Sequence, residues 1–593
     1  MCGIVGYIGK ENCLEKIIKG LKSLEYRGYD SAGIAYVDNN NKVKIKKCEG
    51  RIKNLEDKLD TKISSNIGIG HTRWATHGKP SDVNSHPHKV GKITVVHNGI
   101  IENYNELKGG LLDYEFKSET DTEVIAAIID KMYSLKGDML KVLADLKYLL
   151  TGSYALGILV DGENKIYAIR KDSPLIIGVS PKGNFIASDV PAILEFTNMY
   201  YLILNDEYAV LDEDEVVIYD RDGNICPKDL LTFDGNKEAA QKGGYEHFML
   251  KEINEQPKVV MDTLYPYLDN IKLLDEYQLD KYDHITIVGC GSAYHVGLVG
   301  KSLIMKYGLV NVDVDIASEY RYTDHVYGKN ELIILISQSG ETADTLAVLR
   351  KAKEDKIATL AIVNVVGSSI AREADNVIYI KAGPEIAVAT TKAYMCQLAI
   401  LSIIACYLGI KNHHLKKDIL DEYKDLSKDM EELIENDDDA KKVAKLIYNH
   451  KDIFYIGRKV DYALCMEASL KLKEVSYLHC EAYAAGELKH GTISLVDKNT
   501  PILSIITDDS ISAKTISNVK EVCSRGAMSI VITNTELDDK ELYKEQIVIP
   551  KRIDLIESML VIVKCQLIAY YAAKLKGCDI DKPRNLAKSV TVE

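Results

Sequence analysis

The feature that most constrains the fold of this chain is a long internal repeat. Three apolar, strand-like runs recur further along the sequence: 285–289 with 453–457, 334–337 with 504–507, and 361–364 with 531–534. The last residues of the paired runs are 168, 170 and 170 positions apart (457 − 289, 507 − 337 and 534 − 364). A solenoid repeats every ~20–50 residues, so this much longer period predicts two copies of a whole domain.

Long amphipathic patterns lie between the repeated runs, and this alternation is typical of α/β units around a parallel sheet. We therefore expect two doubly wound α/β domains, at residues 275–415 and 445–580. The first part of the chain instead has short strand-like segments separated by turn residues, which predict packed β-sheets over residues 2–219. A polar stretch at 220–244, with several Gly, Asp and Asn residues, is the predicted linker.

Composition and charge argue against several classes of protein. The net charge of −14 is spread along the 593 residues without a Lys/Arg-rich block, so we expect no nucleic-acid partner. Neither a signal sequence nor a run of ~18 apolar residues stands out, so we expect no membrane partner and a cytoplasmic location. The twelve cysteines form no CxxC pair, and Cys396, Cys406 and Cys565 lie in apolar helical stretches, as reduced core residues do.

The second residue, Cys2, suggests a catalytic nucleophile. Removal of Met1 would leave a free α-amino group on the same residue that carries the thiol. An α-amine titrates near pH ~8 and a thiol near ~8.5, so the neutral amine can accept the thiol proton at physiological pH. A buried, inert cysteine is the alternative.

Other residues of the first part suit an amino-acid substrate. The side-chain amide of Asn98 and the backbone N–H of Gly99 could stabilise an oxyanion, as acyl transfer to a thiol requires. Arg73 could bind a carboxylate and Asp121 an ammonium group, and a molecule that carries both is an amino acid. Each has a plainer interpretation, since an Asn-Gly pair often forms a hairpin turn and an arginine often forms a surface ion pair.

Five motifs carry a family resemblance. Residues 2–6, 24–33, 71–78, 97–103 and 118–122 are similar to the class II glutamine amidotransferase domain. Over nearly its whole length the chain resembles the isomerizing glutamine–fructose-6-phosphate aminotransferases. The resemblance implies a multidomain α/β protein, in which an Ntn-type αββα sandwich is followed by two doubly wound SIS (sugar isomerase) domains.

The resemblance also assigns residues to a glutamine site. It implies that Cys2 is the nucleophile and that Asn98 and Gly99 form the oxyanion hole. Trp74, the only tryptophan of the chain, matches the family's gate to an internal ammonia channel. The implied glutamine-binding residues are Arg73, Trp74, Thr76, His77 and Asp121.

A second site is expected in the first copy of the repeated domain. Residues 337–342 follow an apolar strand and precede a helical pattern, and small hydroxyl residues at a helix N-terminus can bind phosphate. Simple N-capping is the alternative for such a turn. The resemblance favours phosphate and implies a sugar-phosphate site made of Ser292, Ser337, Gln338, Ser339, Thr342, Val388 and Ala389.

The turn at Ser292 departs from the family pattern. Two hydroxyl residues usually close this turn, as Cys-Gly-Thr-Ser, whereas this chain has Cys-Gly-Ser-Ala and ends the turn at Ala293. A hydrogen bond to the sugar is therefore either absent or supplied by a neighbour such as Ser292.

The second copy of the domain lacks the hydroxyl-rich turn of the first copy and has charged residues instead. Adjacent carboxylates at Asp508 and Asp509 would repel a phosphate. Lys471 and Glu474 share one helix face, and their plainer interpretation is a solvated ion pair. By resemblance, Glu474 is the enolisation base, Lys471 assists it, and His490 opens the sugar ring. In relatives this histidine comes from the neighbouring subunit, which implies a homodimer or a higher homo-oligomer.

Residues 581–593 would ordinarily be a frayed tail. They match the family's terminal signature, in which Lys588 forms an imine with fructose 6-phosphate. A mobile tail that carries such a lysine could cover the active site and exclude water.

The implied reaction transfers the amide nitrogen of L-glutamine to D-fructose 6-phosphate with isomerisation, giving D-glucosamine 6-phosphate and glutamate. The sequence has no metal cluster, nucleotide loop or pyridoxal phosphate signature, so we expect no cofactor and no metal. Two other enzymes share the first half. Phosphoribosylpyrophosphate amidotransferase would need an acidic diphosphate-ribose motif and asparagine synthetase an ATP-pyrophosphatase loop, and the sequence has neither. A pair of domains that only senses a sugar phosphate would not need Glu474, His490 and Lys588.

Overall fold

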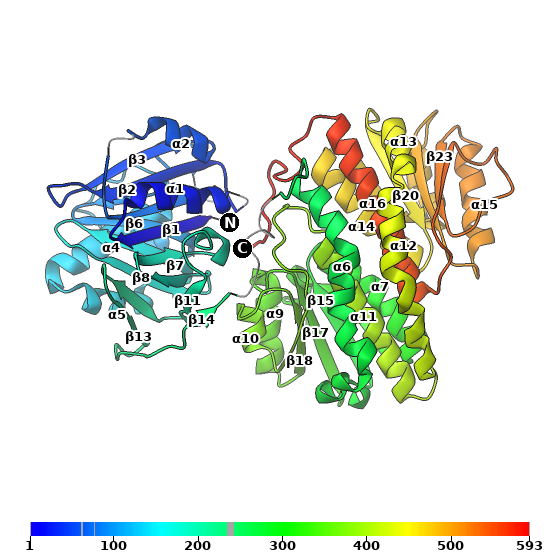
Figure 1. Cartoon of the computed structure of the whole chain (residues 1–593), viewed down its shortest axis with the longest axis horizontal. Helices are drawn as coiled ribbons and strands as arrows, with labels where there is room; N and C mark the ends of the chain where they lie inside the picture. The colour runs from blue at the N-terminus through cyan, green and yellow to red at the C-terminus, as the bar shows by residue number, and fades with distance from the viewer. Residues whose placement is uncertain (1, 26, 61–62, 76–77, 234–241, 592–593) are drawn as a thin grey trace. The chain divides into compact units, whose positions relative to one another are not determined.

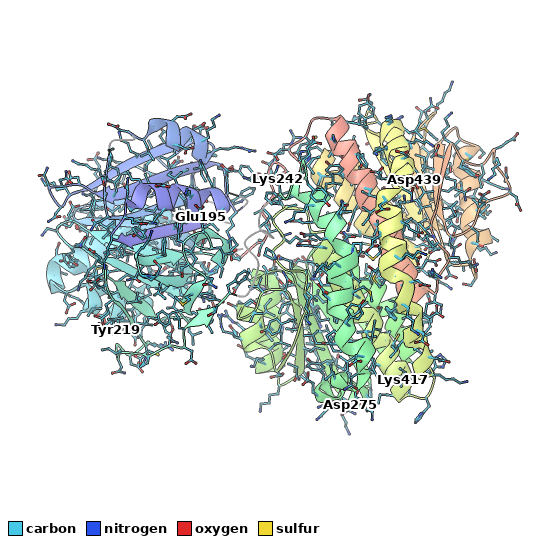
Figure 2. The ribbon with its side chains drawn as sticks, viewed as in Figure 1. Glu195, Tyr219, Lys242, Asp275, Lys417 and Asp439 are labelled. Carbon is cyan, nitrogen blue, oxygen red and sulfur yellow. The ribbon has the colours of Figure 1, made fainter. Side chains whose placement is uncertain are left out.

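The computed structural model describes the chain except for residues 1, 26, 61–62, 76–77, 234–241 and 592–593. Two compact units make up the chain (Figure 1). The first runs to Lys237 and includes the C-terminal residues from Ala587, and the second spans Glu238–Leu586. Charged side chains such as Glu195 and Lys417 lie on the surface of their own unit (Figure 2).

The first unit contains two antiparallel sheets. Their strand orders are β14-β11-β9-β10-β1-β4-β2-β3 and β13-β12-β8-β7-β6-β5. The strands are β1 Gly3–Gly9, β2 Ser31–Val37, β3 Val43–Glu49, β4 Ile67–Arg73, β5 His88–Val90, β6 Ile93–Ile101, β7 Gly152–Val160, β8 Ile166–Lys171, β9 Ile176–Ser180, β10 Gly183–Ala187, β11 Met199–Leu202, β12 Tyr208–Leu211, β13 Val216–Tyr219 and β14 Leu231–Thr232. The helices are α1 Cys13–Ser23, α2 Ile52–Lys58, α3 Tyr104–Gly109, α4 Asp121–Lys136, α5 Met139–Leu149 and the 3₁₀ turn η1 Val190–Ala192.

Three apolar layers show that the two sheets are stacked with helices outside them. Ile4 and Val5 are neighbours on β1, yet Ile4 packs between the sheets and Val5 packs against α1. On β6, Val96 faces the layer between the sheets, whereas Val95 faces α4 and α5. Successive side chains of a strand point to opposite faces, so the central strands are buried on both sides. This arrangement confirms the expected αββα sandwich.

The second unit contains two parallel sheets of five strands. Their orders are β16-β15-β17-β18-β19 and β21-β20-β22-β23-β24, so each copy follows the order 2-1-3-4-5. The strands are β15 His284–Gly289, β16 Asn311–Ile316, β17 Glu331–Ser337, β18 Ala358–Val363, β19 Asn376–Tyr379, β20 Asp452–Gly457, β21 His479–Ala484, β22 Pro501–Ile506, β23 Met528–Thr533 and β24 Glu545–Val548. The shared order confirms the predicted duplication and the doubly wound architecture of each copy.

Helices cover both faces of each parallel sheet. In the first copy, Ile334 of β17 packs towards α7 and α11, whereas Leu335 packs towards α8 and α9. The helices are α6 Phe248–Asp269, α7 Ser292–Leu303, α8 Ala317–Tyr320, α9 Ala343–Glu354, α10 Ser369–Glu373, α11 Lys392–Lys411, α12 Leu426–Glu435, α13 Asp438–Ile447, α14 Val460–Ser476, α15 Ser512–Cys523 and α16 Asp554–Leu575. Shorter turns are η3 Ile271–Tyr277, η4 Leu279–Lys281, η5 Ile304–Gly308, η6 Lys417–Asp425, η7 Glu487–His490 and η8 Thr492–Leu495.

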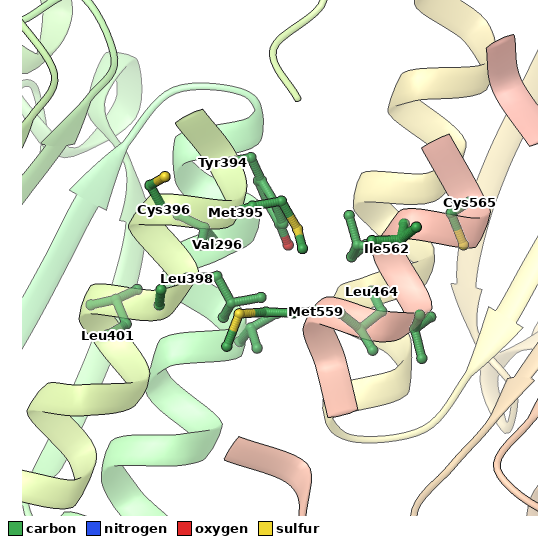
Figure 3. Close-up of a cluster of buried hydrophobic side chains, with 14 of the residues drawn as sticks. Val296, Tyr394, Met395, Cys396, Leu398, Leu401, Leu464, Met559, Ile562 and Cys565 are labelled. Atoms are coloured by element: carbon green, nitrogen blue, oxygen red, sulfur yellow. The ribbon is translucent and has the colours of Figure 1, made fainter. Parts of the chain in front are cut away.

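The two copies share one hydrophobic core. It includes Met395 and Leu398 of α11, Leu464 of α14, and Met559 and Ile562 of α16 (Figure 3). Helices α11 and α16 are long and apolar enough to cross a membrane, although the sequence was expected to contain no such run. In each, 94% of the most apolar window is buried inside the structure. Burial on all sides accounts for this composition, because a helix in the centre of a core has no polar face.

The segment predicted as a linker contains a short strand. β14 lies within residues 220–244 and pairs with β11 at the edge of the eight-stranded sheet. The division between the two units, after Lys237, also falls within this segment. The long helix α6 then follows, outside the bounds predicted for either repeated domain.

Candidate functional site

The first candidate site is a pocket in the first unit, lined by residues from four parts of the fold. Cys2 precedes β1, Arg73 ends β4, Gly99 lies in β6 and Asp121 begins α4. β1 and β4 are antiparallel neighbours in which Gly3 pairs with Thr72, so Cys2 is brought next to the end of β4. The empty space in and at the mouth of the pocket, including the part open to solvent, is about 250 Å³.

The Cys2 thiol lies against the backbone of Trp74. The Trp74 N–H donates to Cys2 Sγ at 3.2 Å, and the Trp74 carbonyl oxygen lies 3.5 Å from the same sulfur. Burial raises the pKa of the thiol, while the Trp74 N–H and the positive charge of Arg73 act against this rise. The thiol therefore needs a base before it can act as a nucleophile.

Asn98 is held by a buried histidine. His71 Nε2 lies 3.1 Å from Asn98 Oδ1 and 2.9 Å from the His97 carbonyl oxygen. Both oxygens are acceptors, so Nε2 carries the ring proton. Burial lowers the pKa of His71 to about 3, which keeps the ring neutral. This contact turns the Asn98 amide so that its Nδ2 donates to the Cys2 carbonyl oxygen at 2.9 Å.

Glycine is required at position 99. Its φ is 136°, in a region that side chains rarely adopt, and a Cβ atom would lie 2.0 Å from the Ser153 carbonyl oxygen. The backbone next to Asn98 therefore has a conformation that other residues could not adopt without shifting β7.

Arg73 and Asp121 bring opposite charges to the same pocket. Both are almost fully buried, with 3% and 5% exposure. Arg73 Nη2 donates to the Gly78 carbonyl oxygen at 3.0 Å, and Asp121 Oδ2 accepts the Ile101 N–H at 2.9 Å. These contacts fix a cation and an anion around one cavity, as binding of an amino acid requires.

The ring of Trp74 packs edge-on against Tyr29, with centroids 5.7 Å apart. Thr76 and His77, the other predicted glutamine-binding residues, lie outside the described residues.

Two further buried histidines near this pocket were not predicted. His86 stacks on His71 with ring centroids 4.1 Å apart, and His86 Nε2 lies 3.1 Å from Thr122 Oγ1. His88 Nε2 lies 3.1 Å from Thr120 Oγ1. Burial lowers the pKa of both histidines well below the ordinary value, so the rings are neutral. Their spacing of two residues was a signal in the sequence, because residues i and i+2 of an extended segment lie on the same face.

The second candidate site lies where the strand order of the first parallel sheet reverses. β15 and β17 are neighbours there, and the helices that follow them, α7 and α9, belong to cores on opposite faces of the sheet. Ligands of such sheets bind at this point, beyond the carboxyl ends of the strands. The turns at 290–292 and 337–342 both lie at these strand ends, so the fold brings the two predicted segments together.

Hydroxyl groups hold the turn between β17 and α9. Ser337 Oγ lies 2.8 Å from Thr342 Oγ1 and accepts the Gly340 N–H at 3.0 Å, and Ser339 Oγ accepts the Glu341 N–H at 3.2 Å. Gly340 has a φ of 64°, and a Cβ atom there would lie 1.9 Å from Ser368 Oγ. Gln338 is half-buried in the same turn. The turn is therefore held in one conformation at the start of α9, where backbone N–H groups can bind phosphate. Its one carboxylate, Glu341, accepts the Ser369 N–H at 2.8 Å.

In the second copy, a side chain of the protein occupies the corresponding position. Thr507 aligns with Ser337 at an offset of 170 residues (507 − 337), and its backbone N–H and hydroxyl both donate to Asp461, at 3.0 and 2.5 Å. Asp461 aligns with Ala293 at an offset of 168 residues (461 − 293). Burial raises the pKa of Asp461 to about 6. The donors that a phosphate would use are therefore already engaged.

Lys471 and Glu474 form a buried contact rather than a solvated ion pair. Lys471 Nζ lies 2.6 Å from Glu474 Oε2, and the lysine side chain is 1% exposed. Although burial lowers it, the carboxylates of Glu474 and Glu467 raise the pKa of Lys471 above its ordinary value. Glu467 was not predicted, although residues 467, 471 and 474 follow the i, i+4, i+7 spacing of one helix face.

Ser292 directs its hydroxyl to Glu467 instead of to open space. Ser292 Oγ donates to Glu467 Oε1 at 2.9 Å, across the boundary between the two copies. The hydroxyl proton of Ser292 is thus already used, and only its oxygen lone pairs remain for a sugar.

The loop that carries Val388 and Ala389 is fixed by buried carboxylates. Glu252 Oε1 accepts the Ala387 N–H at 3.1 Å, and Glu385 Oε1 accepts the Thr391 N–H at 2.9 Å. The Val388 N–H donates to the Asp581 carbonyl oxygen at 3.0 Å.

His490 makes no hydrogen bond or ion pair with Lys471 or Glu474 among the described residues. His490 is exposed at the end of η7 in the second copy. Lys588 is half-buried and belongs to the C-terminal residues that cluster with the first unit.

The chain matches two family models. Residues 278–406 and 446–573 match the SIS domain, and residues 71–195 match a glutamine amidotransferase domain.

Curated proteins of similar sequence match over their full length. A protein of Clostridium tetani is 49% identical over 612 residues. Proteins of Methanosarcina mazei and Bacillus subtilis are 43% and 42% identical over 623 and 605 residues. Each match covers 100% of this chain and 100% of the relative. All three relatives are named glutamine–fructose-6-phosphate aminotransferase (isomerizing).

Two solved structures resemble somewhat more than half of this chain. The C-terminal domain of glucosamine-fructose-6-phosphate aminotransferase from Francisella tularensis is 35% identical, with a TM-score of 0.53. The match covers 58% of this chain and 99% of that domain. A tagatose-6-phosphate ketose/aldose isomerase from Escherichia coli is 16% identical, with a TM-score of 0.50, and covers 59% of this chain and 98% of that one. This second likeness shows a shared fold alone.

Proposed function

The chain belongs to the family of isomerizing glutamine–fructose-6-phosphate aminotransferases, and from this premise we propose which residues perform each half of its reaction. The enzyme transfers the amide nitrogen of L-glutamine to D-fructose 6-phosphate and isomerises the sugar. The products are D-glucosamine 6-phosphate and L-glutamate, in the first step of amino-sugar biosynthesis. The proposal for the glutamine half is carried by one observation: Cys2 lines a pocket with Arg73 and Asp121, and its backbone carbonyl oxygen accepts Asn98 Nδ2.

We propose that Cys2 attacks the amide carbonyl of glutamine. Removal of Met1 would leave an α-amine on Cys2 that can accept the thiol proton, which the raised pKa of the thiol makes necessary. Asn98 Nδ2 and the Gly99 N–H then stabilise the tetrahedral oxyanion. Ammonia leaves, a thioester remains on Cys2, and water hydrolyses it to glutamate.

Charged residues around the pocket bind the two ends of the substrate. Arg73 binds the α-carboxylate of glutamine and Asp121 binds its α-ammonium group, in keeping with their burial at one cavity. By the resemblance, Thr76 and His77 complete this site and Trp74 gates the passage of ammonia to the sugar.

For the sugar half, we propose that the turn from Ser337 to Thr342 binds the phosphate group. Gln338 and Ser339 of this turn, together with Ser292, Val388 and Ala389, bind the rest of the sugar phosphate. The position of the turn at the start of α9, beside β15, supports this role.

Four side chains act on the sugar itself. His490 opens the ring, and Lys588 forms an imine with the C2 ketone, with loss of water. Ammonia then displaces Lys588 from C2, and Glu474 moves the proton from C1 to C2. Lys471, whose pKa is raised, stays protonated and stabilises the C1 oxygen of the enolamine formed in that transfer.

We propose that the active protein is at least a homodimer and is cytoplasmic. His490 is exposed and has no contact with Lys471 among the described residues, which supports its use by a neighbouring subunit. The two most apolar helices are buried in the second unit, and Cys396, Cys406 and Cys565 are buried free thiols, in keeping with a reducing compartment.

The proposal is tested by supplying glutamine and fructose 6-phosphate and identifying the phosphorylated product by mass. We expect glucosamine 6-phosphate with one glutamate released per amino sugar. Cys2→Ala should abolish glutamine hydrolysis and glutamine-dependent synthesis, because no other group in the pocket can form the thioester. Normal synthesis by this variant would refute the assignment of the nucleophile.

A further inference from the structure

The carboxylate of Glu467 joins the two copies of the repeated domain at the proposed sugar site. Its Oε1 accepts the hydroxyl of Ser292 and its Oε2 accepts His295 Nδ1, both at 2.9 Å. These partners lie on the first turn of α7 in the first copy, directly after the sugar-binding turn. Lys471, one turn further along α14, has its Nζ 3.5 Å from Glu467 Oε1.

Full burial makes these contacts obligatory for a charged Glu467. The side chain has 0% exposure, so no water compensates for a lost partner. An ionised carboxylate without donors is strongly unfavourable in such a place. The three donors therefore have to stay where the carboxylate can reach them, and the carboxylate in turn fixes their positions.

We propose that Glu467 is a positioning residue for the sugar half of the reaction. It holds Lys471 beside the base Glu474 and ties both residues to the sugar-binding turn at Ser292. This inference rests on the roles proposed above for Lys471 and Glu474.

The charge balance of the cluster explains why this position matters. Lys471 lies between two carboxylates, at 2.6 Å from Glu474 and 3.5 Å from Glu467. Glu467 and Glu474 therefore compete for the same ammonium group. Without the charge of Glu467, Lys471 would pair with Glu474 alone and more tightly, and the carboxylate of Glu474 would be less free to approach the substrate.

Other titratable groups around Glu467 are few among the described residues. His295 faces it from α7, and Lys471 and Glu474 lie on its own helix. Tyr394 of α11 and Cys565 of α16 also feel its charge, and burial together with that charge keeps the phenol and the thiol neutral. Removal of the negative charge of Glu467 would therefore mainly affect its two cationic or polar partners, Lys471 and His295.

The test is Glu467→Gln, which keeps the shape of the side chain and removes its charge. We expect kcat for glucosamine 6-phosphate synthesis to fall about 10- to 100-fold, with KM for fructose 6-phosphate changed less than about threefold. The alkaline limb of the pH–rate profile should move to lower pH, because Lys471 loses one of the three carboxylates that raise its pKa and keeps Glu474 and Glu385. A purely structural role would lower the rate without moving this limb.

Controls separate this inference from the proposed function. Lys473→Gln, an exposed neutralisation on the same helix, should leave synthesis unchanged, and glutamine hydrolysis at Cys2 should persist in Glu467→Gln. Loss of synthesis in Glu474→Gln, with normal synthesis and an unmoved alkaline limb in Glu467→Gln, would overturn the role of Glu467 alone. Normal synthesis in Glu474→Gln would instead overturn the proposed function of this helix.

A second variant decides the matter if Glu467→Gln does not fold. His295→Gln removes a partner of the same carboxylate that is 12% exposed, and glutamine keeps an N–H donor, so this variant should fold. We expect a kcat loss of about 3- to 10-fold with an unchanged melting temperature, since one of three donors to Glu467 is weakened. An unchanged kcat in this variant would contradict the positioning role.

Discussion

At the scale of single residues, a neutral histidine sets the orientation of the proposed oxyanion hole. His71→Leu removes the donor to Asn98 Oδ1, so the Asn98 amide can turn away from Cys2. We expect kcat for glutamine hydrolysis, measured as glutamate release, to fall about 10- to 100-fold. His71→Gln keeps an N–H donor and should retain more activity than the leucine variant.

The same prediction has a pH component. His71 has a pKa of about 3, so its protonation does not shape the rate between pH 5 and 8. The hydrolysis profile of His71→Leu over this range should therefore have the wild-type shape at a lower rate. Equal rates in the leucine and glutamine variants would show that the His71 proton does not act through Asn98.

A glycine sets the shape of the proposed phosphate turn. In Gly340→Ala, the new Cβ would lie 1.9 Å from Ser368 Oγ in a left-handed backbone conformation, so the turn must move. We expect KM for fructose 6-phosphate to rise about tenfold or more, with glutamine hydrolysis unchanged. Gly109→Ala is the matched control, because a Cβ there meets no atom within 4 Å. An unaltered KM in Gly340→Ala would exclude this turn from the site.

At the scale of elements, helix α16 carries a buried acid that makes the second unit sensitive to pH. Glu557 accepts Asn534 Nδ2 at 3.0 Å and the Arg552 N–H at 3.3 Å. Burial raises its pKa from 4.5 to about 7. The fold therefore favours the protonated acid, so this stability is complete below pH 4.5 and is lost as the pH rises towards 7.

The loss from Glu557 amounts to about 3 kcal/mol for a shift of this size. Asp461, whose pKa is also raised, to about 6, acts in the same direction. Glu557→Gln should flatten the fall in the free energy of unfolding between pH 5 and 7, measured by urea unfolding of the second unit. Glu435→Gln, at an exposed position, should keep the wild-type slope. If both variants keep it, another group causes the pH dependence.

At the scale of the whole molecule, the C-terminal tail that carries Lys588 leaves the second unit after Leu586. The base of the tail is fixed, because Asp581 accepts the Phe248 and Met249 N–H groups at the start of α6. Its carbonyl oxygen also accepts the Val388 N–H. The tail thus begins at the loop that carries two of the proposed sugar-binding residues.

Borohydride added with fructose 6-phosphate should attach the sugar irreversibly to Lys588, located by peptide mass. A reduced imine cannot hydrolyse, so the label marks the lysine that reacts with the C2 ketone. Lys588→Arg keeps the charge but cannot form the imine, so synthesis should fall below detection while glutamine hydrolysis at Cys2 continues. An arginine variant that makes amino sugar at the normal rate would rule out the covalent step.

The sequence by itself determined the architecture of this protein and most of its candidate residues. Strand-like runs at offsets of 168 to 170 residues predicted the duplication, and the two sheets have the same strand order. Short motifs located Cys2, Arg73 and the turn that begins at Ser337, because turns and strand ends depend on neighbouring residues. Such local patterns can be read without knowledge of which helices pack together.

Only the tertiary structure decided which distant residues donate hydrogen bonds to the buried carboxylates. Ser292 and Glu467 are 175 positions apart, and their contact depends on α7 of one copy packing against α14 of the other. Likewise, Asp461 engages the Thr507 N–H group only because β20 and β22 are neighbours in the sheet. A sequence pattern shows which face of an element is buried, but the partner of a buried carboxylate is set by packing. For this reason the sequence placed Lys471 and Glu474 on one helix face, and the fold added Glu467, which connects this face to Ser292 on α7.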